Sequence, residues 1–115
     1  MQGIQQMHRD HVPMIPPGFI LLGSTAVSPI QGMVLPYPAL DDGAVPSATE
    51  THILTVQGHP EFTGPIVEKI IDVRAKRGVI DAERAAKARE DAYKRHDGLG
   101  IIAQAIWKVM LNRLL

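Results

Sequence analysis

The segment Gly58-His59-Pro60 marks a change of character along this sequence. Before it, short apolar runs are interrupted by glycine and proline, a pattern typical of strands and turns. After it, apolar residues recur at helical spacing. A chain of 115 residues with 45% hydrophobic content suits one small domain. The sequence therefore predicts a single α/β domain, with strands in its first half and helices in its second.

Three strands are predicted in the first half of the chain. The run 19–22 follows Pro16-Pro17-Gly18 and is too short to sustain a helix, which favours a buried strand. The runs 30–35 and 53–57 are the next two. Between them, residues 36–51 are rich in proline and small residues without periodicity, so we expect a long surface loop there.

Three helices are predicted after the histidine. The first begins near Pro65, because proline tolerates the first turn, and Gly78 ends it. Asp81 is a candidate N-cap for a second helix that runs to about Arg95. The third, residues 99–115, is apolar on most sides, so we expect it to be buried.

The second predicted helix is rich in alanine and charged residues. Its Glu83/Lys87 and Glu90/Lys94 pairs have the favourable i,i+4 order. We expect a thin apolar stripe and a largely solvated surface.

Charge and cysteine content exclude several classes of function. Twelve Lys and Arg balance twelve Asp and Glu, which favours neither a nucleic acid nor an anionic membrane as partner. The chain has no cysteine, so disulfides, thiolate metal sites and a cysteine nucleophile are all absent. No apolar run approaches the ~20 residues that cross a bilayer, and His8-Arg9-Asp10 interrupts the place of a signal peptide. We interpret the chain as soluble and cytoplasmic.

The candidate chemistry lies at His59 and Glu61, directly after the third predicted strand. Proline at 60 has a fixed φ and disfavours the α region at His59, so the segment is extended. Side chains at i and i+2 of an extended segment point the same way. A carboxylate beside an imidazole orients the ring and leaves its other nitrogen free as a base. Taken alone, His59, Pro60 and Glu61 are better explained as a solvated strand end than as a catalytic site.

Two sequence motifs, in the order in which a known family carries them, favour the catalytic interpretation. The string Val56-Gln57-Gly58-His59-Pro60-Glu61-Phe62 resembles the signature of class I glutamine amidotransferases that carries the catalytic His and Glu. Upstream, the stretch 6–12 and the stretch 18–25, together with Pro29-Ile30-Gln31-Gly32-Met33 between the motifs, also resemble that family. The resemblance is closest to members related to γ-glutamyl peptidases and to the glutaminase domain of GMP synthetase. It covers residues 1–78; the helical extension 79–115 carries no matching motif.

The resemblance implies a partial flavodoxin-like domain that hydrolyses the side-chain amide of glutamine, or a γ-glutamyl bond, without a cofactor. In the family a cysteine on a G-x-C-x-G elbow forms a thioester, His59 would serve as base and acid, and Glu61 would orient it. That cysteine is absent here, and no serine or threonine lies in an elbow-like setting. We therefore expect no activity from this chain alone.

The segment His8-Arg9-Asp10 aligns with a loop that helps to hold the glutamine substrate in relatives, which implies a substrate contact. Several relatives have glycine in place of Arg9, and a side chain there could close the pocket. The alternative is that His8 and Asp10 cap a strand end and pair with each other.

Two other functions compete with the amidotransferase interpretation. Suitable ligands for a metal ion are present, although their spacing matches no standard motif. The candidates are His8, Asp10, His11, His52, His59 and Glu61. The second rival is a non-catalytic module, truncated or pseudoenzyme-like, that binds a protein partner or self-associates. A partial domain would leave strand edges and apolar faces uncovered, so we expect a marginally stable chain that tends to associate.

Overall fold

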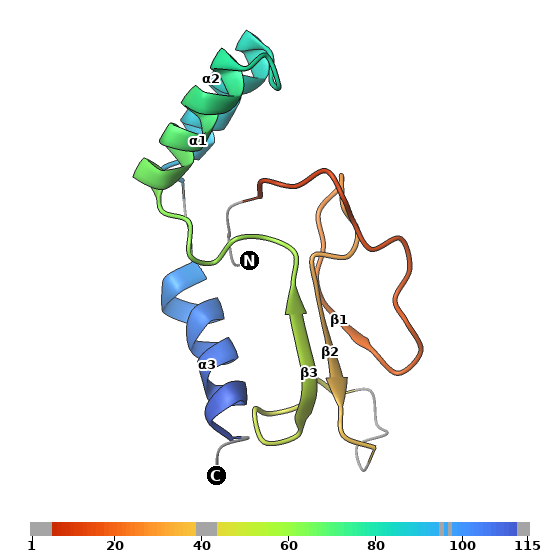
Figure 1. Ribbon diagram of the computed structural model, residues 1–115. Helices are drawn as coiled ribbons and strands as arrows, with labels where there is room; N and C mark the ends of the chain where they lie inside the picture. Colours follow the sequence, from red (N-terminus) through yellow and green to blue (C-terminus); the bar gives the residue numbers. More distant parts are fainter. Residues whose placement is uncertain (1–5, 39–43, 95, 97, 113–115) are drawn as a thin grey trace.

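The computed structural model describes residues 6–38, 44–94, 96 and 98–112 (Figure 1). It is an α/β arrangement in which a small sheet is followed by a helical hairpin and a C-terminal helix. The elements are β1 (Ile20–Gly23), β2 (Gly32–Pro36), β3 (Thr51–Val56), α1 (Gly64–Lys76), α2 (Ala82–Asp91), the π-helix η1 (Gly98–Ile102) and α3 (Ala103–Asn112).

The sheet is an antiparallel meander in the order β1-β2-β3. Its central strand β2 carries the buried Val34, and Ile30 just before that strand is also buried. Both outer strands have an unpaired edge within the described part of the chain. The three predicted strands are confirmed with small shifts at their ends, but the first was expected to be buried and instead exposes Leu21 and Leu22, because it is an outer strand of the sheet. The described sheet contains no parallel pair, so it does not by itself show the flavodoxin-like arrangement.

The hairpin of α1 and α2 forms as the sequence predicts. Pro65 lies in the first turn of α1. Gly78 adopts a φ of +69° after the helix end, a conformation that suits glycine. Asp81 caps α2, its carboxylate accepting from the backbone N–H of Arg84 at 2.8 Å. Ile71 on α1 is fully buried against the alanine side of α2.

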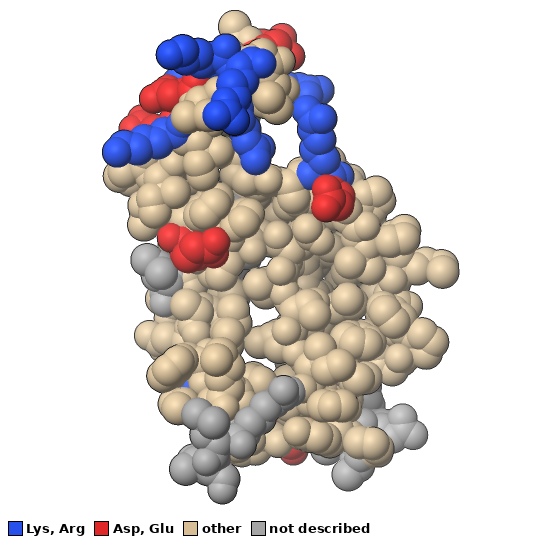
Figure 2. All heavy atoms as spheres, viewed as in Figure 1, with Lys and Arg blue, Asp and Glu red and all other residues tan. Residues whose placement is uncertain are grey.

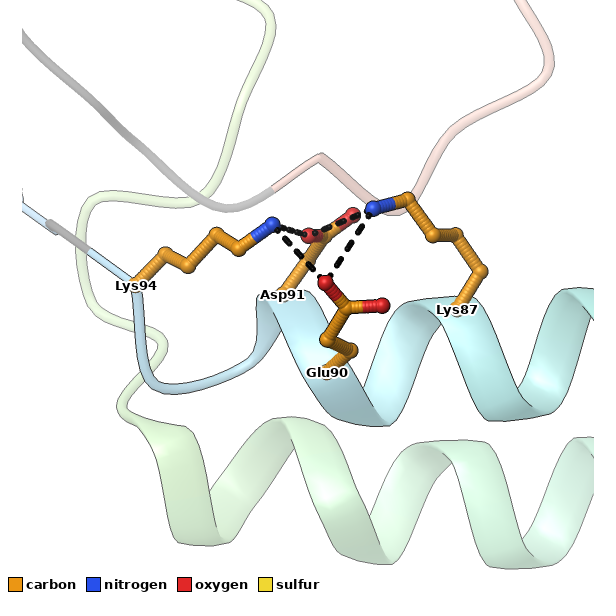
Figure 3. A network of polar contacts seen from close by, with 4 residues as sticks. All are labelled: Lys87, Glu90, Asp91 and Lys94. Atoms are coloured by element: carbon orange, nitrogen blue, oxygen red, sulfur yellow. Dashed lines mark hydrogen bonds and ion pairs between the residues drawn. The ribbon is translucent and has the colours of Figure 1, made fainter.

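Helix α2 differs from the prediction in length and in one ion pair. It ends at Asp91, whereas the sequence suggested a helix to about Arg95. Lys87 pairs with Glu90 and Asp91 at the end of the helix, not with Glu83 (Figure 3). Two carboxylates near the lysine outcompete the single one a turn earlier. The expected Glu90/Lys94 pair is confirmed.

The C-terminal helix is less buried than predicted. The π-helix η1 precedes α3, and α3 contains no buried residue within its bounds. Its Trp107 is 58% exposed and Met110 53% exposed. The expected last turn, 113–115, lies outside the described residues. A hollow of about 430 Å³ separates α3 from the sheet, far more than a packed core leaves empty.

The molecule is elongated. The α1–α2 hairpin projects away from the sheet, while α3 runs beside β3 (Figure 1). The radius of gyration is 16.2 Å, against roughly 13 Å for a compact chain of this length. The accessible surface of 8034 Å² exceeds the roughly 6,200 Å² of a compact monomer of this mass by about 1,800 Å².

Charge is distributed very unevenly over this shape. Lysine and arginine gather over the hairpin, while the part formed by the sheet and α3 is almost entirely uncharged (Figure 2). Residues 11–38 contain no Asp, Glu, Lys or Arg, residues 44–60 contain only Glu50, and residues 98–112 contain only Lys108. We call the sheet, η1 and α3 together the uncharged body.

Candidate functional site

His59 and Glu61 form a hydrogen-bonded pair directly after β3. The Nδ1 atom of His59 lies 2.9 Å from Oε1 of Glu61. Because an ionised carboxylate only accepts, Nδ1 carries the proton that it donates. The other nitrogen, Nε2, has no hydrogen-bond partner within the described structure. The predicted proximity of the two side chains is confirmed, and the geometry leaves Nε2 free to accept a proton.

Phe62 fixes the plane of the imidazole. The rings of His59 and Phe62 stack with centroids 4.0 Å apart and planes 4° from parallel. Phe62 also packs against the hairpin core that contains Val67 and Ile71. The hairpin therefore orients His59 through the phenyl ring, as the strand does through the backbone.

A third segment reaches the same place from the C-terminal side. The Nε2 atom of His96 donates to the carbonyl oxygen of Pro60 at 3.1 Å. Gly98 packs so closely that an added Cβ would collide with Pro60 and with the ring of His96. The backbone of Pro60, between the two candidate catalytic residues, is thus contacted by His96 and Gly98 from the C-terminal part of the chain. The sequence contains no motif that could have revealed His96 or Gly98.

The electrostatics of the pair favour an ionised carboxylate. The hydrogen bond from His59 is the main cause that lowers the pKa of Glu61 below its usual value, followed by a backbone hydrogen bond. The side chain of Glu61 is 60% exposed and that of His59 35% exposed. Both side chains are therefore open to an approaching molecule.

The segment His8-Arg9-Asp10 lies on a different surface. It borders a cleft along α1, and within the described residues no hydrogen bond, ion pair or cleft joins it to His59 or Glu61. The ring of His8 is engaged internally, with Nδ1 2.6 Å from the carbonyl oxygen of Asp10 and Nε2 2.7 Å from Oε1 of Gln6. The alternative in which His8 and Asp10 pair with each other describes this local geometry, although the contact is to the backbone of Asp10.

The candidate metal ligands do not converge. The part of the chain that the structure describes holds no group of three or more His, Asp or Glu side chains able to bind a metal ion. His52 instead stacks on Tyr37, with centroids 4.9 Å apart.

No hydroxyl stands in for the missing cysteine. Within the described hydrogen bonds, Thr25 and Ser28 bond to each other, and Ser47 bonds to Thr49 and Glu50 in loops. None of them contacts His59. Within the described residues, neither a hydroxyl nor a thiol is hydrogen-bonded to the His59–Glu61 pair. No helix in the described residues has the length and apolarity to cross a membrane.

Comparison with known proteins finds a sequence similar to most of this chain. A segment of 94 residues, 82% of this chain, is 33% identical to a glutamine amidotransferase-like protein of Schizosaccharomyces pombe. This chain is similar to part of a glutamine amidotransferase-like protein. The match covers 31% of that relative, so the chain spans less than half of the relative's length. No protein-family model and no solved structure matches the chain.

Proposed function

We propose that His59 and Glu61 are the base and the orienting carboxylate of a class I Cys-His-Glu glutaminase site whose cysteine comes from a second polypeptide segment. One observation carries this proposal: the 2.9 Å bond from His59 Nδ1 to Glu61 that leaves Nε2 free. The motif around the pair and the amidotransferase-like relative support the same chemistry.

The proposed reaction proceeds through a thioester. His59 Nε2 takes the proton of the incoming cysteine, and the thiolate attacks the side-chain amide carbon of glutamine. The C–N bond then breaks, and the imidazolium returns the proton to the departing ammonia. Water, deprotonated by His59, cleaves the thioester to give glutamate and the free thiol. Glu61 holds the ring in the Nδ1–H tautomer and stabilises the imidazolium throughout.

The uncharged body is the surface that we expect the cysteine-bearing segment to cover. It carries exposed Leu21, Leu22 and Trp107 and the hollow beside α3. Part of the surplus of about 1,800 Å² of accessible surface would be buried by such a partner, and the projecting hairpin also contributes to that surplus. A flavodoxin-like domain, completed by parallel strands against the free edge of β3, would bury this face.

The test is reconstitution. This chain is mixed with a cysteine-bearing amidotransferase half, and ammonia release is measured from glutamine and from a γ-glutamyl amide. We expect activity only in the mixture, with His59→Ala lowering kcat at least about a thousandfold and Glu61→Gln less. His11→Ala, at an exposed histidine outside the sheet, is the matched control. Activity that survives His59→Ala contradicts the proposed role.

The same surface supports a second candidate function. A non-catalytic module would also need an uncharged body that binds a protein partner or another copy of itself. A tight complex with the cysteine-bearing half that releases no ammonia from either substrate would favour this alternative.

A further inference from the structure

A cleft of about 690 Å³ lies on the hairpin, away from the His59–Glu61 pair. One wall is the face of α1 turned away from α2. The other wall is the N-terminal segment from Met7 to Asp10. This end of the molecule is where lysine and arginine side chains gather (Figure 2).

Four cationic side chains line the cleft: Arg9 from the N-terminal segment and Lys69, Arg74 and Arg77 from α1. Asp10 is the only carboxylate among the lining residues. In a chain whose formal net charge is zero, the cleft thus has a local surplus of positive charge. Lys69 on α1 and Arg77 at its C-cap both line the cleft, so their side chains border the same space.

These cations differ from those described on α2 and just after it, which have carboxylate partners. On α2 and just after it, Arg84, Lys87, Arg89 and Lys94 all form ion pairs (Figure 3 shows two of them). Within the described residues, no side chain lining the cleft forms an ion pair. Within the described residues, the cations of α2 thus form ion pairs, whereas those of the cleft and Lys76 at the end of α1 do not.

The arginines in the cleft make only weak contacts of their own. Arg74 lies 4.0 Å from the sulfur of Met7, and Arg9 donates to the carbonyl oxygen of Val79 at 3.4 Å. Each guanidinium retains N–H donors that no described group satisfies, and such a fork suits the oxygens of an anion. Basic residues near a helix C-terminus favour the helix dipole. That explains Arg74 and Arg77, but not Lys69 in the first half of α1.

Apolar side chains alternate with the cations along the cleft. Met7, Ile70, Val73 and Val79 contribute to its lining. A ligand that carries an organic group beside its charge could pack that group against them. A bare polar ion would leave this part of the cleft unused.

We propose that this cleft binds a small phosphate-bearing molecule with at least two negative charges, a phosphomonoester or a diphosphate. Four cations against one carboxylate suit a ligand of that charge, whereas zwitterionic glutamine carries no net charge. The site is separate from the His59–Glu61 pair, and its ligand is not the proposed amide substrate.

Calorimetric titration with inorganic pyrophosphate tests the proposal on the full chain. We expect saturable one-to-one binding that weakens as salt rises to about 0.2 M, where exposed charges are screened beyond about 7 Å. The variant K69Q/R77Q removes two exposed cations without a described partner, so it should keep the fold. It should bind at least tenfold more weakly, because each of the two side chains can donate a charge-assisted hydrogen bond to the anion.

The control R84Q/K87Q removes the same charge from α2 and should bind within about twofold of the unmodified chain. Circular dichroism melting of all three proteins checks that they fold alike. Equal weakening in both variants would show a general charge effect and overturn the site. So would the absence of pyrophosphate binding, or binding to phosphatidic acid vesicles with none to pyrophosphate. Because ammonia release is not measured, these results do not depend on the proposed glutaminase function.

Discussion

The imidazole of His96 holds the carbonyl oxygen of Pro60 at 3.1 Å across 36 residues of sequence. Pro60 stands between His59 and Glu61, so this contact and the close approach of Gly98 fix the segment that carries the candidate chemistry. The strand β3 and the stacked ring of Phe62 fix it from two other sides. A pair that is 35% and 60% exposed is thereby held in place by its backbone and neighbours rather than by burial.

Removal of the His96 side chain should weaken this attachment. His96→Ala leaves the Pro60 carbonyl without its described side-chain donor. We expect the free energy of unfolding in urea to fall by about 1 kcal/mol, the usual value of such a hydrogen bond. His11→Ala, at an exposed histidine with no described partner, should leave it unchanged. Equal stability of the two variants would show that the contact contributes nothing.

Two nearby glycines should respond in opposite ways to alanine. At Gly98 a Cβ would collide with the backbone of Pro60, so we expect a loss of about 1–3 kcal/mol from overpacking. At Gly100 a Cβ would meet open space, and alanine is the better helix former by up to about 1 kcal/mol. Thermal unfolding of both variants measures the contrast. A Gly98→Ala variant as stable as Gly100→Ala contradicts the close packing.

The stability of the fold should depend on pH through the Glu61 carboxyl. Because its pKa is lower in the folded chain, it stabilises the fold above the unfolded value of 4.5, and this contribution disappears as pH falls through the folded value. Glu61→Gln should therefore reduce stability at about pH 6 but not at about pH 2.5. Carbon-13 titration should show the pKa of Glu61 rising toward 4.5 in His59→Ala and unchanged in His52→Ala.

The single tryptophan reports directly on the uncharged body. Trp107 is 58% exposed on α3, so a partner that covers this face should shift its emission to shorter wavelength. We expect that shift with rising protein concentration or on addition of the cysteine-bearing half. Leu111→Glu, at a residue 40% exposed on the same helix, should suppress it by burying a charge. Ile66→Glu, at a residue 42% exposed on α1, is the matched control. Emission that is constant under both conditions rules out burial of Trp107.

Local sequence signals predicted the elements well because each has a local physical cause. Pro65 and Gly78 bound α1, and Asp81 caps α2, through interactions within a few residues. The proximity of His59 and Glu61 was predicted from the sequence, but its expected cause was wrong: Pro60 and Glu61 lie in a turn, closed by a hydrogen bond from the Phe62 N–H to the His59 carbonyl oxygen at 3.3 Å, rather than in an extended segment.

The features that sequence could not predict depend on distant parts of the chain. His96 reaches Pro60 without any motif, and the cleft forms only because the N-terminal segment crosses α1. The apolar pattern of α3 predicted burial, but a pattern does not specify what buries a helix. Helix α2 ends at Asp91, and no capping or breaker residue in the sequence marks that end, so its position could not be predicted.

The α1–α2 hairpin makes its core from neighbours in sequence, whereas the attachment of His96 to Pro60 closes a loop around the whole hairpin. Contacts of low sequence separation form fast and open together as a cooperative unit. Amide hydrogens in α1 should therefore exchange as one group, at a rate distinct from those of β2. His59 is held by β3 through the backbone and by the hairpin through Phe62. The orientation of its imidazole therefore depends on both parts being folded at the same time.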